Sequence, residues 1–120
     1  MPLFRPKSTP DDEGYYPAGA AADLSQEQMR KVDVGGVAVI VTRLEGELFA
    51  FAAACPHAAA DLAKATIYRG RIDCPDHGYR FDVRSGRVLW PPDEVCRLRL
   101  FEAIEVEGQI KVRRPAMPGR

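Results

Sequence analysis

Four side chains that can bind metal lie in two short segments of the chain. Cys55-Pro56-His57 is followed, after sixteen residues, by Cys74-Pro75-Asp76-His77. The chain has three cysteines and two histidines, so these two segments contain all of them except Cys96. Each segment offers one thiolate and one imidazole, donors that bind iron–sulfur clusters and zinc. Cysteines paired with histidines in this way indicate an iron–sulfur site in a reducing compartment rather than a disulfide framework.

The local sequence allows each segment to direct its two donors toward one target. In an extended loop, residues two apart point to the same side, so Cys55 and His57 can face one site. The second segment has two residues between Cys74 and His77 and therefore needs a turn. Gly78 can adopt the positive φ that brings the backbone close to an inorganic sulfide. A proline after each cysteine stiffens both loops, which suits a centre that changes charge without changing shape.

Zinc is the main alternative metal, because two cysteines and two histidines can also bind zinc tetrahedrally. Zinc sites usually pair cysteine with cysteine and histidine with histidine, whereas each segment here mixes the two types. The mixed order therefore favours an iron–sulfur centre. Metal analysis separates the two, since a zinc domain is colourless and contains neither iron nor acid-labile sulfide.

Short antiparallel strands are expected to carry both segments. Apolar and polar residues alternate from Met29, and Gly35-Gly36 and Glu45-Gly46 predict turns in a three-strand meander that ends near Ala53. The same reasoning predicts hairpins at Gly70 and at residues 84–86, and a closing hairpin at Gly108. At most one helical turn is expected, at residues 23–28. The fold class is therefore all-β, an antiparallel sandwich or barrel.

One domain is expected from a chain of 120 residues. Residues 1–14 contain three prolines without a periodic apolar pattern and are interpreted as a flexible N-terminal tail, with the domain at 15–114 and a C-terminal tail at 115–120. Seventeen basic and seventeen acidic residues cancel, which argues against nucleic-acid or anionic-membrane partners. Without a signal peptide or a membrane span, a cytoplasmic protein is predicted.

The two segments, together with the residues that follow them up to Asp82, resemble the Rieske [2Fe–2S] proteins. The pattern of that family is C-x-H, a spacer of about sixteen residues, and C-x-x-H. A weaker resemblance extends over residues 15–113. It implies a Rieske fold, in which a β-sandwich or barrel base carries a small cluster-binding subdomain, about residues 54–92, with two ligand loops.

The resemblance also implies the role of each ligand. Cys55 and Cys74 would bind one iron of a single [2Fe–2S] cluster, and His57 and His77 would bind the other. In the family the histidine-bound iron lies nearer the surface. The two histidines are therefore the expected exit for an electron.

Several neighbouring residues differ from those of high-potential respiratory members of the family. Those members carry a disulfide between the ligand loops, and the corresponding positions here are Ala60 and Asp76. They also donate hydrogen bonds to sulfur from a serine and a tyrosine, where this chain has Tyr79 and Phe81. Phe81 has no donor, and the Tyr79 hydroxyl is too distant along its ring to replace a serine. Because such bonds stabilise the reduced cluster, a low potential of about −150 mV is predicted.

An electron carrier is favoured over an oxygenase. Terminal Rieske oxygenases add a catalytic domain whose mononuclear iron needs two further histidines and a carboxylate, and both histidines of this chain are already assigned. The resemblance therefore implies a ferredoxin component without its own substrate site. It would pass one electron from a flavin-dependent NAD(P)H reductase to a terminal oxygenase, such as one that hydroxylates aromatic rings.

Two alternative functions stay open. The small subunit of an assimilatory nitrite reductase shares the fold, and co-purification with a large sirohaem protein would favour that function. A zinc-binding structural or regulatory domain is the other alternative. Nothing in the sequence requires more than a monomer, and nothing in it identifies the compound that a downstream oxygenase would oxidise.

Three further features have ordinary explanations. Cys96, expected at the start of a strand, is interpreted as an inert packing thiol. The Trp90-Pro91-Pro92 loop is either a plain loop or, as in the family, a cover for the cluster. The charged residues beside the ligand loops are expected to be solvated and do not identify a partner; they are Lys64, Arg69, Arg71 and Asp76.

Overall fold

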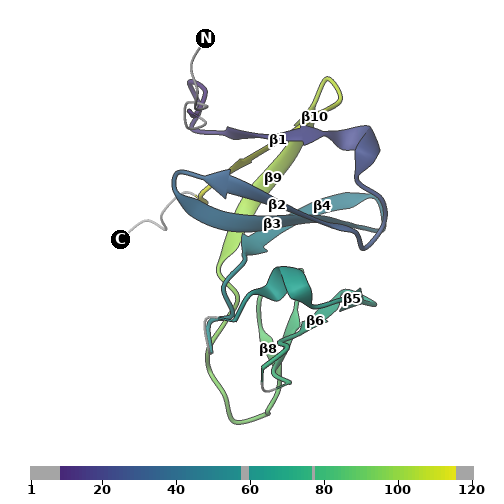
Figure 1. Ribbon diagram of the computed structural model, residues 1–120, viewed down its shortest axis with the longest axis vertical. Helices are drawn as coiled ribbons and strands as arrows, with labels where there is room; N and C mark the ends of the chain where they lie inside the picture. Colours follow the sequence, from purple (N-terminus) through teal and green to yellow (C-terminus); the bar gives the residue numbers. More distant parts are fainter. Residues whose placement is uncertain (1–8, 58–59, 77, 116–120) are drawn as a thin grey trace.

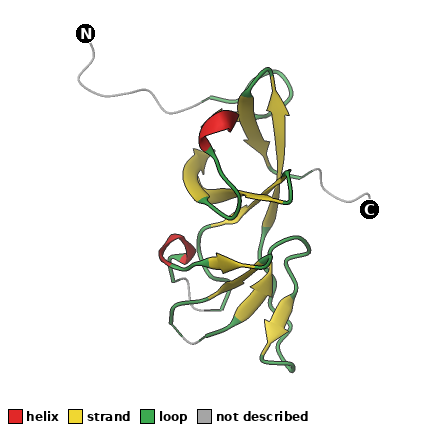
Figure 2. Ribbon diagram, turned by 90° about the vertical axis from the view of Figure 1, so that its right-hand side faces the viewer, coloured by secondary structure: helices red, strands yellow, loops and turns green. Residues whose placement is uncertain are grey.

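A computed structural model describes residues 9–57, 60–76 and 78–115 and places their strands in two antiparallel β-sheets. The larger sheet has the order β1-β10-β9-β4-β3-β2, and the smaller has the order β5-β6-β7-β8. Figures 1 and 2 show the two sheets one beyond the other along the long axis of the molecule. The larger sheet consists of β1 (Tyr16–Ala20), β2 (Met29–Val34), β3 (Val37–Leu44), β4 (Glu47–Ala52), β9 (Leu100–Val106) and β10 (Gln109–Arg113). The all-β prediction is confirmed.

The predicted meander forms β2, β3 and β4. The turn at Gly35 and Gly36 pairs Val34 with Val37, and the next turn pairs Leu44 with Glu47. Both turns have backbone at positive φ, which glycine adopts without steric cost. Strand β4 ends at Ala52 and therefore delivers the chain directly to the first ligand segment.

The strand β1 was missed by the sequence reasoning, because residues 16–20 contain a proline and two alanines without clear alternation. Tertiary pairing overrides this weak propensity, since Tyr16 lies opposite Val112 and Pro17 opposite Lys111 on β10. Strand β9 joins the two halves of the sheet by pairing with both β10 and β4. The resulting sheet is nearly closed, like a barrel (Figure 1).

Strand β3 is buried on both of its faces and divides the core into two clusters. Val39 and Val41 pack with Ile110 inside the larger sheet. Ile40 and Leu44 point to the other face and pack in a second cluster that extends to the smaller sheet. This double burial explains the continuous apolar run of the strand, which differs from the alternation expected of a strand with one solvated face.

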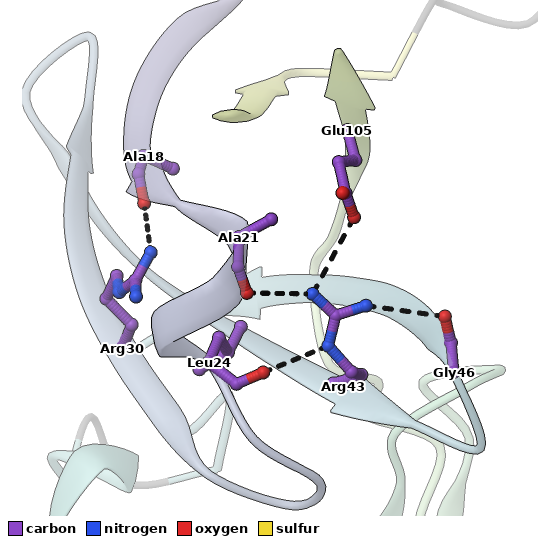
Figure 3. Close-up of polar contacts among 7 residues, drawn as sticks. All are labelled: Ala18, Ala21, Leu24, Arg30, Arg43, Gly46 and Glu105. Carbon is purple, nitrogen blue, oxygen red and sulfur yellow. Dashed lines mark hydrogen bonds and ion pairs between the residues drawn. The ribbon is translucent and has the colours of Figure 1, made fainter. Parts of the chain in front are cut away.

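Arg43, on β3, fixes the connection between β1 and β2 (Figure 3). Its guanidinium donates hydrogen bonds to the carbonyls of Leu24 (3.0 Å), Ala21 (3.1 Å) and Gly46 (3.4 Å), and lies 3.7 Å from Glu105 on β9. The connection contains one turn of 3₁₀ helix, η1 (Ala21–Asp23), followed by a hydrogen-bonded turn at residues 25–28. The single helical turn that was expected at 23–28 thus begins two residues earlier.

Part of the predicted N-terminal tail contacts the domain. Asp11 closes a turn with Tyr15 and forms an ion pair with Lys111 on β10, with 2.9 Å between Nζ and Oδ2. Arg113 donates a hydrogen bond to the Glu13 carbonyl. Residues 1–8 of this predicted tail, and residues 116–120 of the C-terminal one, lie outside the described residues.

The smaller sheet follows the two predicted hairpins. It consists of β5 (Ile67–Tyr68), β6 (Arg71–Asp73), β7 (Arg80–Asp82) and β8 (Val88–Trp90), and the 3₁₀ turn η2 (Leu62–Lys64) precedes it. Gly86, with a φ of 77°, turns β7 toward β8. A Cβ at this position would lie 2.8 Å from the carbonyl oxygen of Leu98, so only glycine fits there. None of the helices in the described part of the chain is long and apolar enough to cross a membrane.

Candidate metal centre

The first ligand loop, residues 55–60, is closed at its base by backbone pairing. Ala54 forms a β-bridge with Asp61, and the Cys55 amide donates a 2.8 Å hydrogen bond to the Ala60 carbonyl. The Asp61 side chain accepts a hydrogen bond from the Ala63 amide at the start of η2 and another from Lys31 at 3.0 Å. The bond from Lys31 has the larger effect, and together the two bonds hold the pKa of Asp61 below its usual range. The loop is therefore anchored to β2 of the larger sheet.

The second ligand loop, residues 74–79, connects β6 to β7. Asp73 and Arg80 form the last pair of the two strands, and the Cys74 amide donates a 2.6 Å hydrogen bond to the Tyr79 carbonyl. The Gly78 amide donates to the Cys74 carbonyl at 3.0 Å, and Gly78 has a φ of 74°. The prediction that Gly78 adopts positive φ is confirmed.

The loops place both cysteines in the interior and His57 at the surface. Cys55 and Cys74 are each 2% exposed and belong to the same core cluster, together with Leu62, Ile72, Phe81 and Leu98. His57 is exposed. His77, the fourth predicted ligand, lies outside the described residues. For the three predicted ligands that are described, the structure gives sulfur donors on the inside and an imidazole on the outside.

Tyr79 has a role that the sequence did not reveal. Its ring stacks on that of His57, with 3.7 Å between the ring centroids and 13° between the planes. Its hydroxyl lies near the Glu94 carboxylate. Burial, followed by the charge of Glu94, raises the pKa of Tyr79 above its ordinary value of 10.0. An aromatic residue next to the second loop was the only available signal, and nothing in the sequence pointed to Glu94.

The neighbours of Tyr79 agree with the predictions made for them, with one correction. Phe81 is fully buried and serves as a core residue. Cys96 is half-buried, and burial together with the charge of Glu94 raises the pKa of its thiol, as expected of an unreactive cysteine. The prediction that Cys96 lies at the start of a strand is wrong. Cys96 lies in an irregular loop, and β9 begins at Leu100. The two prolines after Trp90 prevent regular pairing there.

Arg71, one of the charged residues beside the loops, shares an ion-pair partner with Arg80. The Nε atoms of Arg71 and Arg80 each lie 3.6 Å from a carboxylate oxygen of Asp73. The guanidinium groups of Arg69 and Arg71 lie 5.2 and 5.9 Å from the centre of the Tyr68 ring, which is exposed. Lys64 and Asp76 are exposed, as predicted.

A family model described as the Rieske [2Fe-2S] domain matches residues 14–110, which cover most of this chain. The chain belongs to this family. The Rieske fold that was predicted from the resemblance is therefore confirmed. The predicted cofactor, a [2Fe–2S] cluster, is confirmed as well.

Similar proteins include both much longer chains and chains of about the same length. Apoptosis-inducing factor 3 of Mus musculus is 35% identical over 86 residues, which are 72% of this chain and 14% of that protein. This Rieske domain therefore spans only a small part of that relative. The ferredoxin component of the alkene monooxygenase system of Xanthobacter autotrophicus is 32% identical over 109 residues, 90% of this chain and 87% of that one.

A chain in a solved structure also resembles this Rieske domain, and the match covers that whole chain. The solved structure is the complex of reduced oxygenase and oxidized ferredoxin in carbazole 1,9a-dioxygenase. One of its chains is 28% identical to this one with a TM-score of 0.78, and the match covers 88% of this chain and 100% of that chain.

The described residues fit a [2Fe–2S] cluster. A Rieske cluster needs two thiolates on one iron and imidazoles on the other, so its two ends require different surroundings. Cys55 and Cys74 lie in one apolar cluster, where the shell around sulfur excludes water. His57 lies at the surface, and a Cβ on Gly78 would meet no atom within 4 Å, so the second loop is open at Gly78.

Proposed function

We propose that this protein is a one-electron carrier in an oxygenase system. Cys55 and Cys74 hold one iron of a [2Fe–2S] cluster, and His57 and His77 hold the other. The bound cluster supplies reversible uptake and release of a single electron. The observation that carries the proposal is the pair of buried cysteines on two loops that also present an exposed imidazole. The role of His77 rests on its spacing from Cys74 alone.

The residues around the loops give the carrier a low potential. Phe81 occupies the core without a donor group, and the Tyr79 hydroxyl lies at the far end of a ring that stacks on His57. Neither side chain therefore donates the sulfur hydrogen bond that raises the potential of respiratory members. We expect a midpoint potential of about −150 mV, the low end of the Rieske range.

A flavin-dependent NAD(P)H reductase is the proposed electron donor, and a terminal oxygenase is the proposed acceptor. The names of the alkene monooxygenase and carbazole dioxygenase relatives support the acceptor. The smaller sheet and the loop that follows it also support a docking role, because large apolar side chains are exposed there: Tyr68, Leu89, Trp90 and Val95. Exposed apolar side chains near a redox site are typical of a protein–protein contact. The proposed location is the cytoplasm, where both partners and reduced thiols are found.

The test is metal analysis of protein prepared without oxygen, followed by a redox titration. We expect two irons and two acid-labile sulfides per chain, a red-brown colour, and the EPR signal of a reduced Rieske centre. The titration should follow a one-electron curve with a midpoint below zero. One zinc without iron or sulfide would overturn the proposed cofactor assignment, and a clearly positive midpoint would overturn the low-potential carrier.

A further inference from the structure

Tyr79 connects three segments that meet at the cluster-binding loops. Its backbone carbonyl accepts the hydrogen bond of the Cys74 amide and so closes the second ligand loop. Its ring covers the ring of His57 in the first loop. Its hydroxyl lies near Glu94, in the irregular loop that follows Trp90. Each of the three contacts reaches a different part of the chain.

The ring contact with His57 is close and nearly parallel. The two ring centroids lie 3.7 Å apart with 13° between the planes, whereas the ring of Phe81 lies 6.4 Å from that of Tyr79 and is tilted by 32°. Flat stacking at this distance restricts rotation of both rings, because any tilt brings their edges into contact. It also shields one face of the imidazole from water. His57 is exposed, so the Tyr79 ring is a substantial constraint on its orientation.

Tyr79 is itself held in place from two sides. Its ring packs against the core cluster that contains both cysteines. On the outer side, the Glu94 carboxylate lies near the Tyr79 hydroxyl and the Cys96 thiol. The Glu94 amide donates to the Pro91 carbonyl at 3.3 Å, which forms a turn in that loop. The irregular loop therefore lies close to the outer side of Tyr79.

We propose that Tyr79 is a positioning residue for the iron-binding histidine. The stacked ring sets the plane of the His57 imidazole, and packing of Tyr79 against the core cluster holds the ring in the stacked position. The inference rests on the proposed role of His57 as an iron ligand. The ring plane of an imidazole ligand determines its overlap with iron orbitals and its exposure to water, so both the spectrum and the retention of the centre should depend on Tyr79.

Three substitutions separate the ring from the hydroxyl. Tyr79→Leu removes the flat ring and the hydroxyl, Tyr79→Phe removes only the hydroxyl, and Tyr79→Trp restores a flat ring of another shape. Tyr68→Leu is the matched control, because Tyr68 is an exposed tyrosine of the same small sheet whose ring contacts are with Arg69 and Arg71. Each protein is reduced with dithionite, and the readouts are EPR g-values, resonance Raman iron–histidine bands, and the rate of iron release to a chelator.

We expect Tyr79→Leu to shift the g-values and the iron–histidine bands and to release iron about 2- to 10-fold faster, as the loss of one aromatic pair predicts. Tyr79→Phe and Tyr79→Trp should keep bands near those of the original protein, and Tyr68→Leu should match it in every readout. If the leucine variant contains no cluster, a loaded phenylalanine variant with unchanged bands supports the role of the ring.

Two results overturn the inference without affecting the proposed function. One is a loaded leucine variant whose spectra and iron release equal those of the original protein. The other is a phenylalanine variant as impaired as the leucine variant, because the stack would then not be the feature that matters. Absence of iron from the original protein is a different outcome, which contradicts the cofactor assignment itself.

Discussion

The two ends of the molecule use their side chains differently. The small sheet and the ligand loops, residues 54–98, carry seven basic and six acidic side chains. The larger sheet, residues 9–53 and 99–115, carries seven basic and eleven acidic ones. Four of the five exposed large apolar side chains in the described part of the chain belong to the first group; the exception is Val106. The overall charge of zero therefore conceals a more positive end that carries the site and a more negative base.

The two ends of the molecule also differ in how their surface side chains are satisfied. In the base, charged groups are satisfied within the protein: Arg43 binds three carbonyls and Arg113 binds Glu102 at 2.6 Å. At the other end, apolar side chains such as Trp90, 49% exposed, have been left at the surface. Exposed apolar area lowers solubility unless a partner covers it. We interpret the base as the support and the small sheet as the contact surface.

The largest expected effect comes from removing a buried cysteine of the site. Cys74→Ala should abolish binding of iron and sulfide, because no other thiol lies at that position of the second loop. Cys96→Ala is the control, since Cys96 is a half-buried thiol that packs against the same core cluster but lies outside both ligand segments. Iron and sulfide analysis with the visible spectrum measures both variants. Equal loss in the two variants would make Cys96 part of the centre and contradict the proposed ligand set.

The two core clusters can be compared with one substitution placed in each. Ile72 and Ile110 are both fully buried, but Ile72 belongs to the cluster that contains the cysteines and Ile110 to the cluster inside the larger sheet. Each isoleucine-to-alanine change should lower the free energy of unfolding by about 2–5 kcal/mol. Only Ile72→Ala should also speed the release of iron under conditions where the protein stays folded.

Chemical unfolding followed by circular dichroism, with iron release followed by a chelator, separates the two effects. Because cluster loss makes unfolding irreversible, unfolding midpoints at one fixed incubation time are compared rather than equilibrium values. Equal rates of iron release from the two folded variants would show that the division of the core has no bearing on the site.

Arg43 and Arg30 test how the base is stabilised. Arg43→Met removes three hydrogen bonds to backbone carbonyls and should lower the free energy of unfolding by about 1–3 kcal/mol. Arg30→Met removes a single hydrogen bond, to the Ala18 carbonyl at 2.7 Å, and should cost about 1 kcal/mol. The thermal midpoint and the reduced EPR spectrum of each variant are the measurements. A changed EPR spectrum in either variant would contradict the separation of base and site.

The sequence predicted most of the fold because its turns are marked by local residues. Gly35, Gly46, Gly70 and Gly108 each lie at a hairpin where the backbone has positive φ, and the alternation between them identified the strands correctly. Strand β1 was missed because its partner, β10, is almost a hundred residues away and its own residues have weak β-propensity. Pairing at that distance is decided by the tertiary structure.

The candidate site was predicted in part for a similar reason. Spacing identified the four ligands, since they lie within two short segments and each segment can direct its donors locally. The contacts of Tyr79 could not be predicted, because His57 and Glu94 come from loops twenty-two residues before it and fifteen residues after it. The comparison of Tyr79 with the serine of respiratory members concerned its hydroxyl alone, whereas the structure shows a contact made by the face of its ring.

The smallest expected effect concerns the ion pair that fastens the N-terminal segment to the base. The Asp11 side chain raises the pKa of Lys111 above 10.5, while the bond to Lys111 lowers the pKa of Asp11 to about 2. A lysine whose pKa is raised in the folded state stabilises that state fully below its unfolded pKa and loses this contribution as pH rises through the folded value. Asp11 stays charged throughout this range. Its pair with Lys111 should therefore weaken only above about pH 10.

Lys111→Met tests this contribution. The variant should be slightly less stable than the original protein from pH 7 to about pH 9, and the difference should shrink above about pH 10, where Lys111 loses its proton. Both groups are exposed, so the effect should be small and should decrease in salt. Urea unfolding midpoints of both proteins across this range measure it, and Lys31→Met, which breaks the similar pair with Asp61 near the ligand loop, provides the comparison at the other end. If only the Lys31 variant releases iron faster, the surface ion pair near the ligand loop affects the site and the one in the base does not. Equal iron release from the two variants would mean that only the core residues of the two ends differ in their effect on the site.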